Sequence, residues 1–221
     1  MIRPVIVCFG DSLTWGCPPF INISRPPGRL PRQMRWPRVM EAALGDVDVI
    51  EQGLSGRTTV FDDPIEGAYK NGSRTILAVV ESHSPLDVLI IMLGTNDFKL
   101  QFNVTAYNSA RGVLTLVQTI KGHYALAEAS PDILIVTPPA ITDDAEPAFW
   151  SGAQQRCVGH AHYLAQVAER TGCFHFDANS VTAVGTDGTH MEPEGQRLLG
   201  QALAAKVRAI LDMRALGSRD I

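Results

Sequence analysis

Ser12 occupies a position where a serine hydroxyl could react. The apolar run Val5–Phe9 has the length and character of a buried strand, and it leads directly into Gly10, Asp11 and Ser12. Serine is a preferred helix-capping residue, so Ser12 by itself can be explained as the cap of the next helix. A serine at the tip of a buried strand can also act as a nucleophile, provided that a base takes its proton. For this residue alone, both interpretations stay open.

An acid and a base that could serve Ser12 occur near the other end of the chain. Asp187 and His190 lie three residues apart in the stretch TDGTH. This spacing lets the carboxylate reach the imidazole within one turn, and a third group that holds the tautomer of the base makes a serine nucleophile effective. Taken alone, the two residues could also be turn residues that precede a final helix.

Two further stretches supply hydrogen-bond donors of the kind that ester chemistry needs. Attack on an ester carbonyl creates an oxyanion, which must be stabilised by donors. Gly56, in QGLSGRTT, offers a backbone N–H without side-chain bulk, and Asn96, in GTND, offers a side-chain amide. Each of them alone is typical of a turn.

The elements that must position these residues alternate between strand and helix. Five short, continuous apolar runs have the character of strands covered on both faces: Val5–Phe9, Val47–Glu51, Val88–Leu93, Ile133–Thr137 and Cys173–Phe176. Helical patterns separate or follow them: Trp36–Leu44, Ser73–Ser82, Thr105–Ala127, Pro147–Arg170 and Pro193–Leu211.

This alternation predicts an α/β protein with a parallel sheet and helices on both faces. Right-handed crossovers then give a three-layer α/β/α sandwich with a flavodoxin-like, doubly wound, five-stranded sheet in the order 2-1-3-4-5. We expect residues 1–221 to form a single domain. Ligands of such sheets bind at the carboxyl ends of the strands. Four of the five expected strands are followed there by the small, polar or titratable residues described above.

The four blocks FGDSLTWG, GLSGRTT, LGTND and DGTH resemble the motif blocks of the GDSL or SGNH hydrolases, in the order of that family. Arg35–Trp36, the DDP at 62–64 and the stretch IIMLGTNDFK are further similar to its arylesterase/acyltransferase branch. The resemblance implies the SGNH hydrolase fold and a serine esterase that needs no cofactor. Such an enzyme would cleave small carboxylic esters, such as aryl or acetyl esters, through an acyl-serine intermediate, with acyl transfer to alcohols as a further activity.

The resemblance also implies a role for each matching residue. Ser12 would be the nucleophile, His190 the base and Asp187 its orienting acid. The backbone N–H groups of Ser12 and Gly56, with the side chain of Asn96, would form the oxyanion hole. One position departs from the family pattern: Glu51 stands where members often have asparagine, which concerns the local geometry at the end of a strand.

Two other classes of function remain as alternatives. A metal-dependent phosphoesterase would place Asp11, Asp97, Asp187 and His190 around two ions, but such sites call for more histidines near these strand ends, and we expect no metal. His160 and His162 fall in a helical pattern, where residues two apart do not face the same way, so surface positions are expected for both. The second alternative is a non-catalytic, flavodoxin-like ligand-binding module.

The substrate pocket is less clearly marked in the sequence. Aromatic side chains could form its wall, or pack in the core instead. The candidates for the pocket are Asp11, Trp15, Phe20, Phe149 and Trp150. The proline-rich stretch Cys17–Arg35 is expected to be a long ordered loop that walls the acyl pocket or joins a subunit contact. A homo-oligomer is left open.

Composition argues against several other partners. The net charge is −4 and basic residues do not cluster, which speaks against nucleic acid. No apolar run approaches the length of about 18 residues that a membrane span requires. The four cysteines lack the spacing of metal sites or disulfide frameworks, which favours a reduced, cytoplasmic protein. The expected partner is a small-molecule ester.

Overall fold

The structure, a computed structural model, describes residues 3–20, 28–127 and 129–217. Five parallel strands form one sheet in the order β2-β1-β3-β4-β5, which confirms the predicted strand order. The strands are β1 (Val5–Gly10), β2 (Asp48–Gly53), β3 (Val88–Met92), β4 (Asp132–Thr137) and β5 (Phe174–Asp177).

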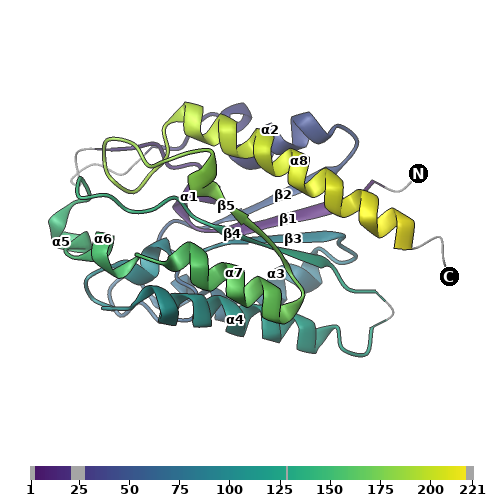
Figure 1. Cartoon of the computed structure of the whole chain (residues 1–221), viewed down its shortest axis with the longest axis horizontal. Helices are drawn as coiled ribbons and strands as arrows, with labels where there is room; N and C mark the ends of the chain where they lie inside the picture. The colour runs from purple at the N-terminus through teal and green to yellow at the C-terminus, as the bar shows by residue number, and fades with distance from the viewer. Residues whose placement is uncertain (1–2, 21–27, 128, 218–221) are drawn as a thin grey trace.

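Helices cover both faces of this sheet, as predicted for a three-layer sandwich. The α-helices are α1 (Ser12–Trp15), α2 (Trp36–Leu44), α3 (Ile76–Ser82), α4 (Ala106–His123), α5 (Pro147–Trp150), α6 (Ala153–Arg156), α7 (His160–Thr171) and α8 (Pro193–Gly217). Helices α2 and α8 pack on one face, and α3, α4 and α7 pack on the other (Figure 1).

Alternation of side chains along the strands creates the two halves of the core. In β1, Ile6 and Cys8 pack toward α2 and α8, whereas Val7 and Phe9 pack toward α3, α4 and α7. Successive residues of a strand point to opposite faces, so a sheet covered on both sides requires continuous apolar runs. This is why the strands were recognisable from short runs without alternation.

The stretch expected as one helix over Pro147–Arg170 is instead divided into α5, α6 and α7. Gly152, with φ of 72°, and Gly159, with φ of 82°, stand at the two breaks. A residue in the left-handed region cannot continue a right-handed helix, and glycine adopts that region without steric cost. The expected single helix was therefore wrong at these two glycines, and the chain there turns around the carboxyl edge of the sheet.

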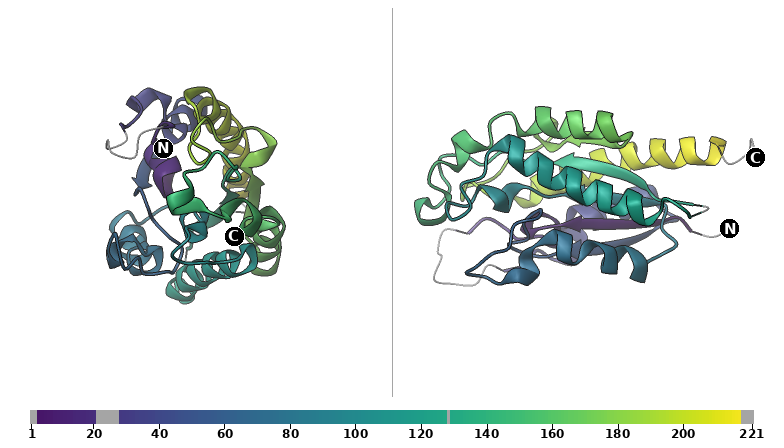
Figure 2. Two further views of the ribbon diagram at one scale, coloured as in Figure 1. Left: turned by 90° about the vertical axis from the view of Figure 1, so that its left-hand side faces the viewer. Right: turned by 90° about the horizontal axis from the view of Figure 1, so that it is seen from below.

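The carboxyl ends of the strands point toward the end of the molecule where α5 and α6 lie, at the left of Figure 1. The left view of Figure 2 looks onto this edge. Ser12, the first residue of α1, follows β1 here, and the short 3₁₀ helix Thr95–Phe98 follows β3. Within the residues that the structure describes, no helix is long and apolar enough to cross a membrane.

Candidate active site

Ser12, His190 and Asp187 lie in a hydrogen-bonded line at this edge. The Oγ of Ser12 is 3.0 Å from Nε2 of His190, and Nδ1 of His190 is 2.7 Å from Oδ2 of Asp187. Both distances lie within hydrogen-bond range. The serine belongs to the start of α1, while the other two residues lie in the loop between β5 and α8. The arrangement gives a serine hydroxyl a base, and the base an orienting carboxylate.

Backbone donors hold the carboxylate of Asp187. Its Oδ1 accepts hydrogen bonds from the N–H groups of Thr189 at 3.0 Å and His190 at 2.8 Å. Its Oδ2 accepts a further bond from the N–H of Phe20 at 3.1 Å, across 167 positions of sequence. Burial opposes ionisation, but hydrogen bonds from the His190 side chain and from the backbone N–H groups of His190 and Thr189 keep the pKa of Asp187 below its ordinary value. The carboxylate is therefore ionised at neutral pH.

Three groups near the serine have the donors that an oxyanion requires. Ser12 is the first residue of α1, where an N–H has no acceptor within the helix. Gly56 has φ of 79°, and none of the described residues accepts a hydrogen bond from its N–H. The amide nitrogen of Asn96 is bonded to Oδ2 of Asp11 at 3.3 Å and to the carbonyl of Arg57 at 3.1 Å. All three groups line the same cavity as His190.

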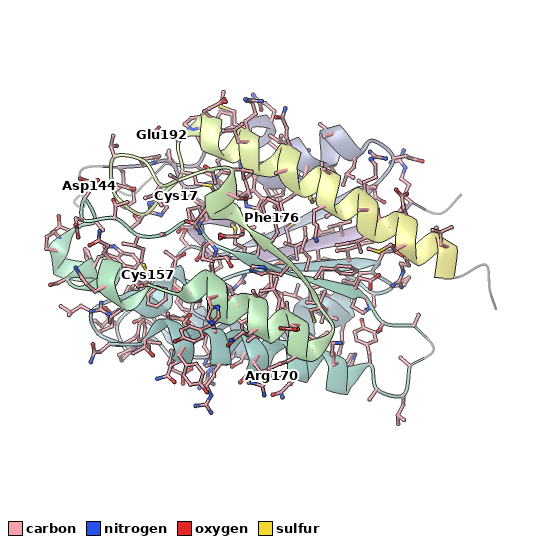
Figure 3. All side chains as sticks on the ribbon, viewed as in Figure 1. Cys17, Asp144, Cys157, Arg170, Phe176 and Glu192 are labelled. Carbon is pink, nitrogen blue, oxygen red and sulfur yellow. The ribbon has the colours of Figure 1, made fainter. Side chains whose placement is uncertain are left out.

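This cavity has a volume of about 280 Å³. Its lining combines aromatic, charged and hydroxyl-bearing side chains: Ser12, Cys17, Phe20, Ser55, Gly56, Glu66, Thr95, Asn96, Lys99, Phe149, Trp150, Thr189 and His190. The ring of Phe20 lies 5.4 Å from that of His190. Figure 3 labels Cys17, one of the lining residues, near this end of the sheet. The volume suits a small ligand.

The comparisons with known proteins identify the family of this chain. A model of the GDSL-like lipase/acylhydrolase family matches residues 8–198, which is most of the chain. The chain belongs to the GDSL-like lipase/acylhydrolase family. It is a serine-type carboxylic ester hydrolase with the SGNH fold, and the alternatives of a phosphoesterase and a binding module are not favoured.

Solved structures of esterases are similar to this GDSL hydrolase over nearly its whole length. A carbohydrate acetylesterase from Sinorhizobium meliloti is 36% identical, with a TM-score of 0.88, and the match covers 94% of this chain and 100% of that chain. The aryl esterase of M. smegmatis, in an inhibitor-bound form, is 36% identical, with a TM-score of 0.86 and the same coverage. A search among curated proteins finds no match.

Two of the pocket candidates named from the sequence do not line the cavity of the GDSL hydrolase. The ring of Trp15 packs instead against Arg29, whose guanidinium carbon lies 5.0 Å from the ring centroid. Asp11 is fully buried: it caps α1 through the N–H of Leu13 at 2.9 Å and contacts Asn96. Burial raises the pKa of Asp11 to about 6. Asp11 is thus placed to orient Asn96 rather than to touch a substrate.

Phe20, Phe149 and Trp150 do line the cavity, which their aromatic character alone left undecided. The proline-rich stretch supplies Phe20 and Cys17 to this wall, whereas residues 21–27, in the middle of the stretch, lie outside the described residues. At the far end of the stretch, Arg35 lies 3.4 Å from Glu51 in an ion pair with little exposure. The unusual Glu51 therefore serves to anchor the loop that leads to the cavity.

The cavity also contains residues that sequence reasoning missed. Glu66 and Lys99 line it as an ion pair, and Thr95 and Thr189 contribute hydroxyl groups. Thr95 and Lys99 both stand within the stretch IIMLGTNDFK. This position was the one signal in the sequence that could have placed them in the site. Charged residues in loops are usually solvated, so the sequence offered no reason to place Glu66 in a cavity.

The expectation that His160 is a surface histidine was wrong. His160 is buried, its ring packs edge-on against Phe98 at 5.1 Å, and burial lowers its pKa to about 4. Its position at the start of α7, just after the break at Gly159, turns it inward. Among the described residues, no three His, Cys, Asp or Glu side chains are grouped so that they could hold a metal ion.

Asp97, which follows Asn96 in the chain, is a buried carboxyl group whose protonation affects the stability of the fold. Its carboxylate accepts bonds from the N–H of Thr59 at 2.9 Å and from the hydroxyls of Thr59 and Ser109 at 2.7 Å each. Burial nevertheless raises its pKa to about 6. The pKa of an unfolded aspartate is about 3.9, so the folded state binds the proton more tightly. Ionisation of Asp97 therefore lowers stability as the pH rises from about 4 to about 6.

The Asp97→Asn variant lacks this ionisation, and its amide can still bond both hydroxyls. We expect the difference in melting temperature, variant minus wild type, to be more positive at pH 7.5 than at pH 4.5. The change in this difference should be a few degrees, since 1 kcal/mol of stability corresponds to about 2–4 °C. Thermal unfolding of both proteins at the two pH values measures this. An equal difference at both pH values would show that Asp97 does not titrate in this range.

Proposed function

We propose that this GDSL hydrolase cleaves small carboxylic esters, acetyl esters first among them, through an acyl-enzyme on Ser12. The observation that carries the proposal is the line from the Ser12 hydroxyl through His190 to Asp187, placed in a cavity of about 280 Å³. The small cavity supports a short acyl group, because it lies at the low end of ligand-site volumes of about 300–1,000 Å³. The likeness to acetyl and aryl esterases supports the same choice.

In the proposed reaction, Oγ of Ser12 attacks the ester carbonyl carbon while its proton passes to Nε2 of His190. The carbonyl oxygen becomes an oxyanion, and Asp187 stabilises the imidazolium that forms. When the carbon–oxygen bond of the ester breaks, the alcohol leaves with the proton from His190. Water then attacks the acyl-serine by the same proton route, releases the acid and restores Ser12.

The proposed oxyanion hole consists of the N–H groups of Ser12 and Gly56 and the amide of Asn96. The Asn96 amide already has two acceptors, and the bond to Asp11, at 3.3 Å, is longer than the usual 2.9–3.0 Å. We propose that, as charge develops, the Asn96 N–H that donates to Asp11 donates to the oxyanion instead. A negative oxygen is a stronger acceptor than a neutral carbonyl, so the exchange favours the transition state over the bound ester.

An acyl-enzyme predicts acyl transfer to alcohols, the activity of the arylesterase/acyltransferase branch. With 4-nitrophenyl acetate as donor and added 1-propanol, we expect propyl acetate to form beside acetate, in a ratio that rises with the propanol concentration. Gas chromatography of both products measures the ratio, and mass spectrometry of quenched enzyme locates the acetyl group on Ser12. A ratio that ignores propanol, together with unmodified Ser12, would contradict the proposed intermediate.

A further inference from the structure

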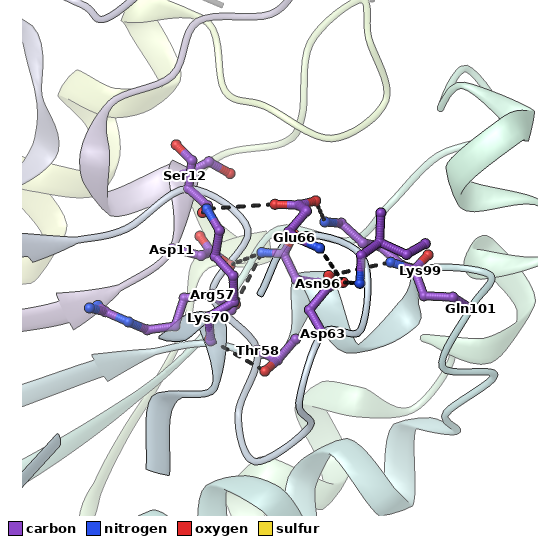
Figure 4. A network of polar contacts seen from close by, with 12 residues as sticks. Asp11, Ser12, Arg57, Thr58, Asp63, Glu66, Lys70, Asn96, Lys99 and Gln101 are labelled. Carbon is purple, nitrogen blue, oxygen red and sulfur yellow. Dashed lines mark hydrogen bonds and ion pairs between the residues drawn. The ribbon is translucent and has the colours of Figure 1, made fainter. Parts of the chain in front are cut away.

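Three charged side chains, Glu66, Lys70 and Lys99, form a cluster beside the proposed oxyanion hole, and the mechanism above uses none of them. Nζ of Lys99 donates to Oε1 of Glu66 at 2.5 Å. Nζ of Lys70 lies 3.6 Å from Oε2 of the same carboxylate and donates to the carbonyl of Ser55 at 2.6 Å. Figure 4 shows Glu66 joined by dashed lines to lysines on both sides, close to Ser12 and Asn96.

Glu66 and Lys99 face the cavity itself. Both line it, although the side chain of Lys99 is only 8% exposed and that of Glu66 is 39% exposed. A buried ammonium group requires a partner, which Glu66 provides. The ammonium carries three N–H donors, however, and only one of them has an acceptor among the described residues. The pair thus presents a donor and an acceptor side by side to whatever enters the cavity.

Two hydroxyl groups of the same cavity also lack partners. Oγ of Ser55 and Oγ1 of Thr95 are inaccessible to solvent, and neither has a hydrogen-bond partner in the described part of the chain. Nearly all buried polar atoms in proteins are hydrogen-bonded, so these two covered hydroxyls are exceptions in the wall of the cavity. The lining of the cavity also includes the aromatic side chains of Phe20, Phe149 and Trp150.

The charges of Glu66 and Lys99 determine which kind of alcohol portion of an ester fits the cavity. An alkyl alcohol would cover the charges of Glu66 and Lys99 without replacing their water, which costs free energy. Lys70 does not line the cavity and is bonded to the carbonyl of Ser55. At the Glu66–Lys99 pair, an incoming carboxylate meets the like charge of Glu66 and an incoming ammonium group meets the like charge of Lys99. A neutral alcohol with additional hydroxyls can accept from Lys99 and donate to Glu66 at the same time.

We propose that the Glu66–Lys99 pair recognises a neutral, polyhydroxylated alcohol portion, such as a sugar or another polyol. Lys99 donates to one hydroxyl and Glu66 accepts from its neighbour. This inference rests on the proposed function, because the acyl portion is taken to be short and without hydroxyls. It assigns a specificity role to two residues outside the catalytic line.

Two esters that differ only in hydroxyl groups provide the test. Glycerol 1-monoacetate and propyl acetate share the acetyl group and a three-carbon alcohol chain, and the first carries two additional hydroxyls. We expect the wild type to favour glycerol 1-monoacetate by at least about tenfold in kcat/KM, since hydrogen bonds to charged groups contribute strongly to discrimination. In Lys99→Met/Glu66→Leu this ratio should fall by about tenfold or more, mainly through KM for the glycerol ester.

The double variant replaces Glu66 and Lys99 by apolar side chains of similar size, an exchange that proteins often tolerate, and Lys70 keeps its bond to the carbonyl of Ser55. Lys99→Met alone provides a second variant, for which the same ratio should fall in the same direction. Titration of active sites with an organophosphonate gives the concentration of competent enzyme, so partial unfolding does not alter the result. Glu194→Gln is the matched control, because Glu194 forms an exposed ion pair with Arg197 on α8 and should leave both rates unchanged.

The outcomes separate the two proposals. A ratio that stays at the wild-type value in both variants, or equal losses for both esters, would overturn the recognition role and leave Glu66 and Lys99 as structural. A wild type that hydrolyses neither ester and does not react with the organophosphonate at Ser12 would overturn the proposed function itself. A selective loss for glycerol 1-monoacetate supports the inference.

Discussion

Ser12→Ala should lower kcat for 4-nitrophenyl acetate by at least about 10⁴, the scale of loss seen when a serine hydrolase loses its nucleophile. The substitution removes the only hydroxyl that lies 3.0 Å from His190 Nε2 among the described contacts, and with it the covalent route. Because the side chain becomes smaller and the backbone of α1 keeps its cap from Asp11, the fold should persist. Initial rates and a melting curve on one preparation measure both effects.

A fluorophosphonate probe shows which serine reacts. It should label the wild type at Ser12 and leave Ser12→Ala unlabelled. Ser55 lines the same cavity but has no contact with His190 among the described residues, so Ser55→Ala should still be labelled at Ser12. Labelling of Ser55 in place of Ser12, or near-normal turnover by Ser12→Ala, would remove Ser12 from the role of nucleophile.

Asn96→Ala should have the second-largest effect, a loss of roughly 10²–10³ in kcat with little change in KM. The hydrogen bond from the amide strengthens as negative charge develops on the carbonyl oxygen, so the ground-state ester gains little from it. The variant should still react slowly with the organophosphonate, since Ser12 and His190 remain. Steady-state kinetics with 4-nitrophenyl acetate separates kcat from KM.

Asn71→Ala is the matched control for this variant. Asn71 is another buried asparagine: its amide donates to the carbonyl of Val60 and its Oδ1 caps the N–H of Ser73. Its loss should lower the melting temperature and spare kcat. If Asn96→Ala behaves in the same way, with a lowered melting temperature and normal turnover, Asn96 is a turn residue rather than an oxyanion donor.

The sequence alone was sufficient for the sheet and for the identity of the polar residues at its edge. Continuous apolar runs such as Val88–Met92 identify strands buried on both faces, and strict right-handed crossovers leave few ways to order them. Ser12, Gly56 and Asn96 could be named in advance because each follows a strand at its carboxyl end. The breaks at Gly152 and Gly159 were missed, because apolar spacing continues across a glycine whether or not its φ turns positive.

Tertiary structure decided which of these residues meet and what surrounds them. Ser12 and His190 are separated by 178 positions, and only the crossovers between parallel strands bring them within 3.0 Å. The inward turn of His160 and the position of Trp15 against Arg29 depend in the same way on packing between segments far apart in sequence. The Glu66–Lys99 pair shows the reason most clearly. The ammonium of Lys99 would be costly to bury alone, so its place in the cavity depends on a partner 33 positions away, and no local pattern encodes such a partner.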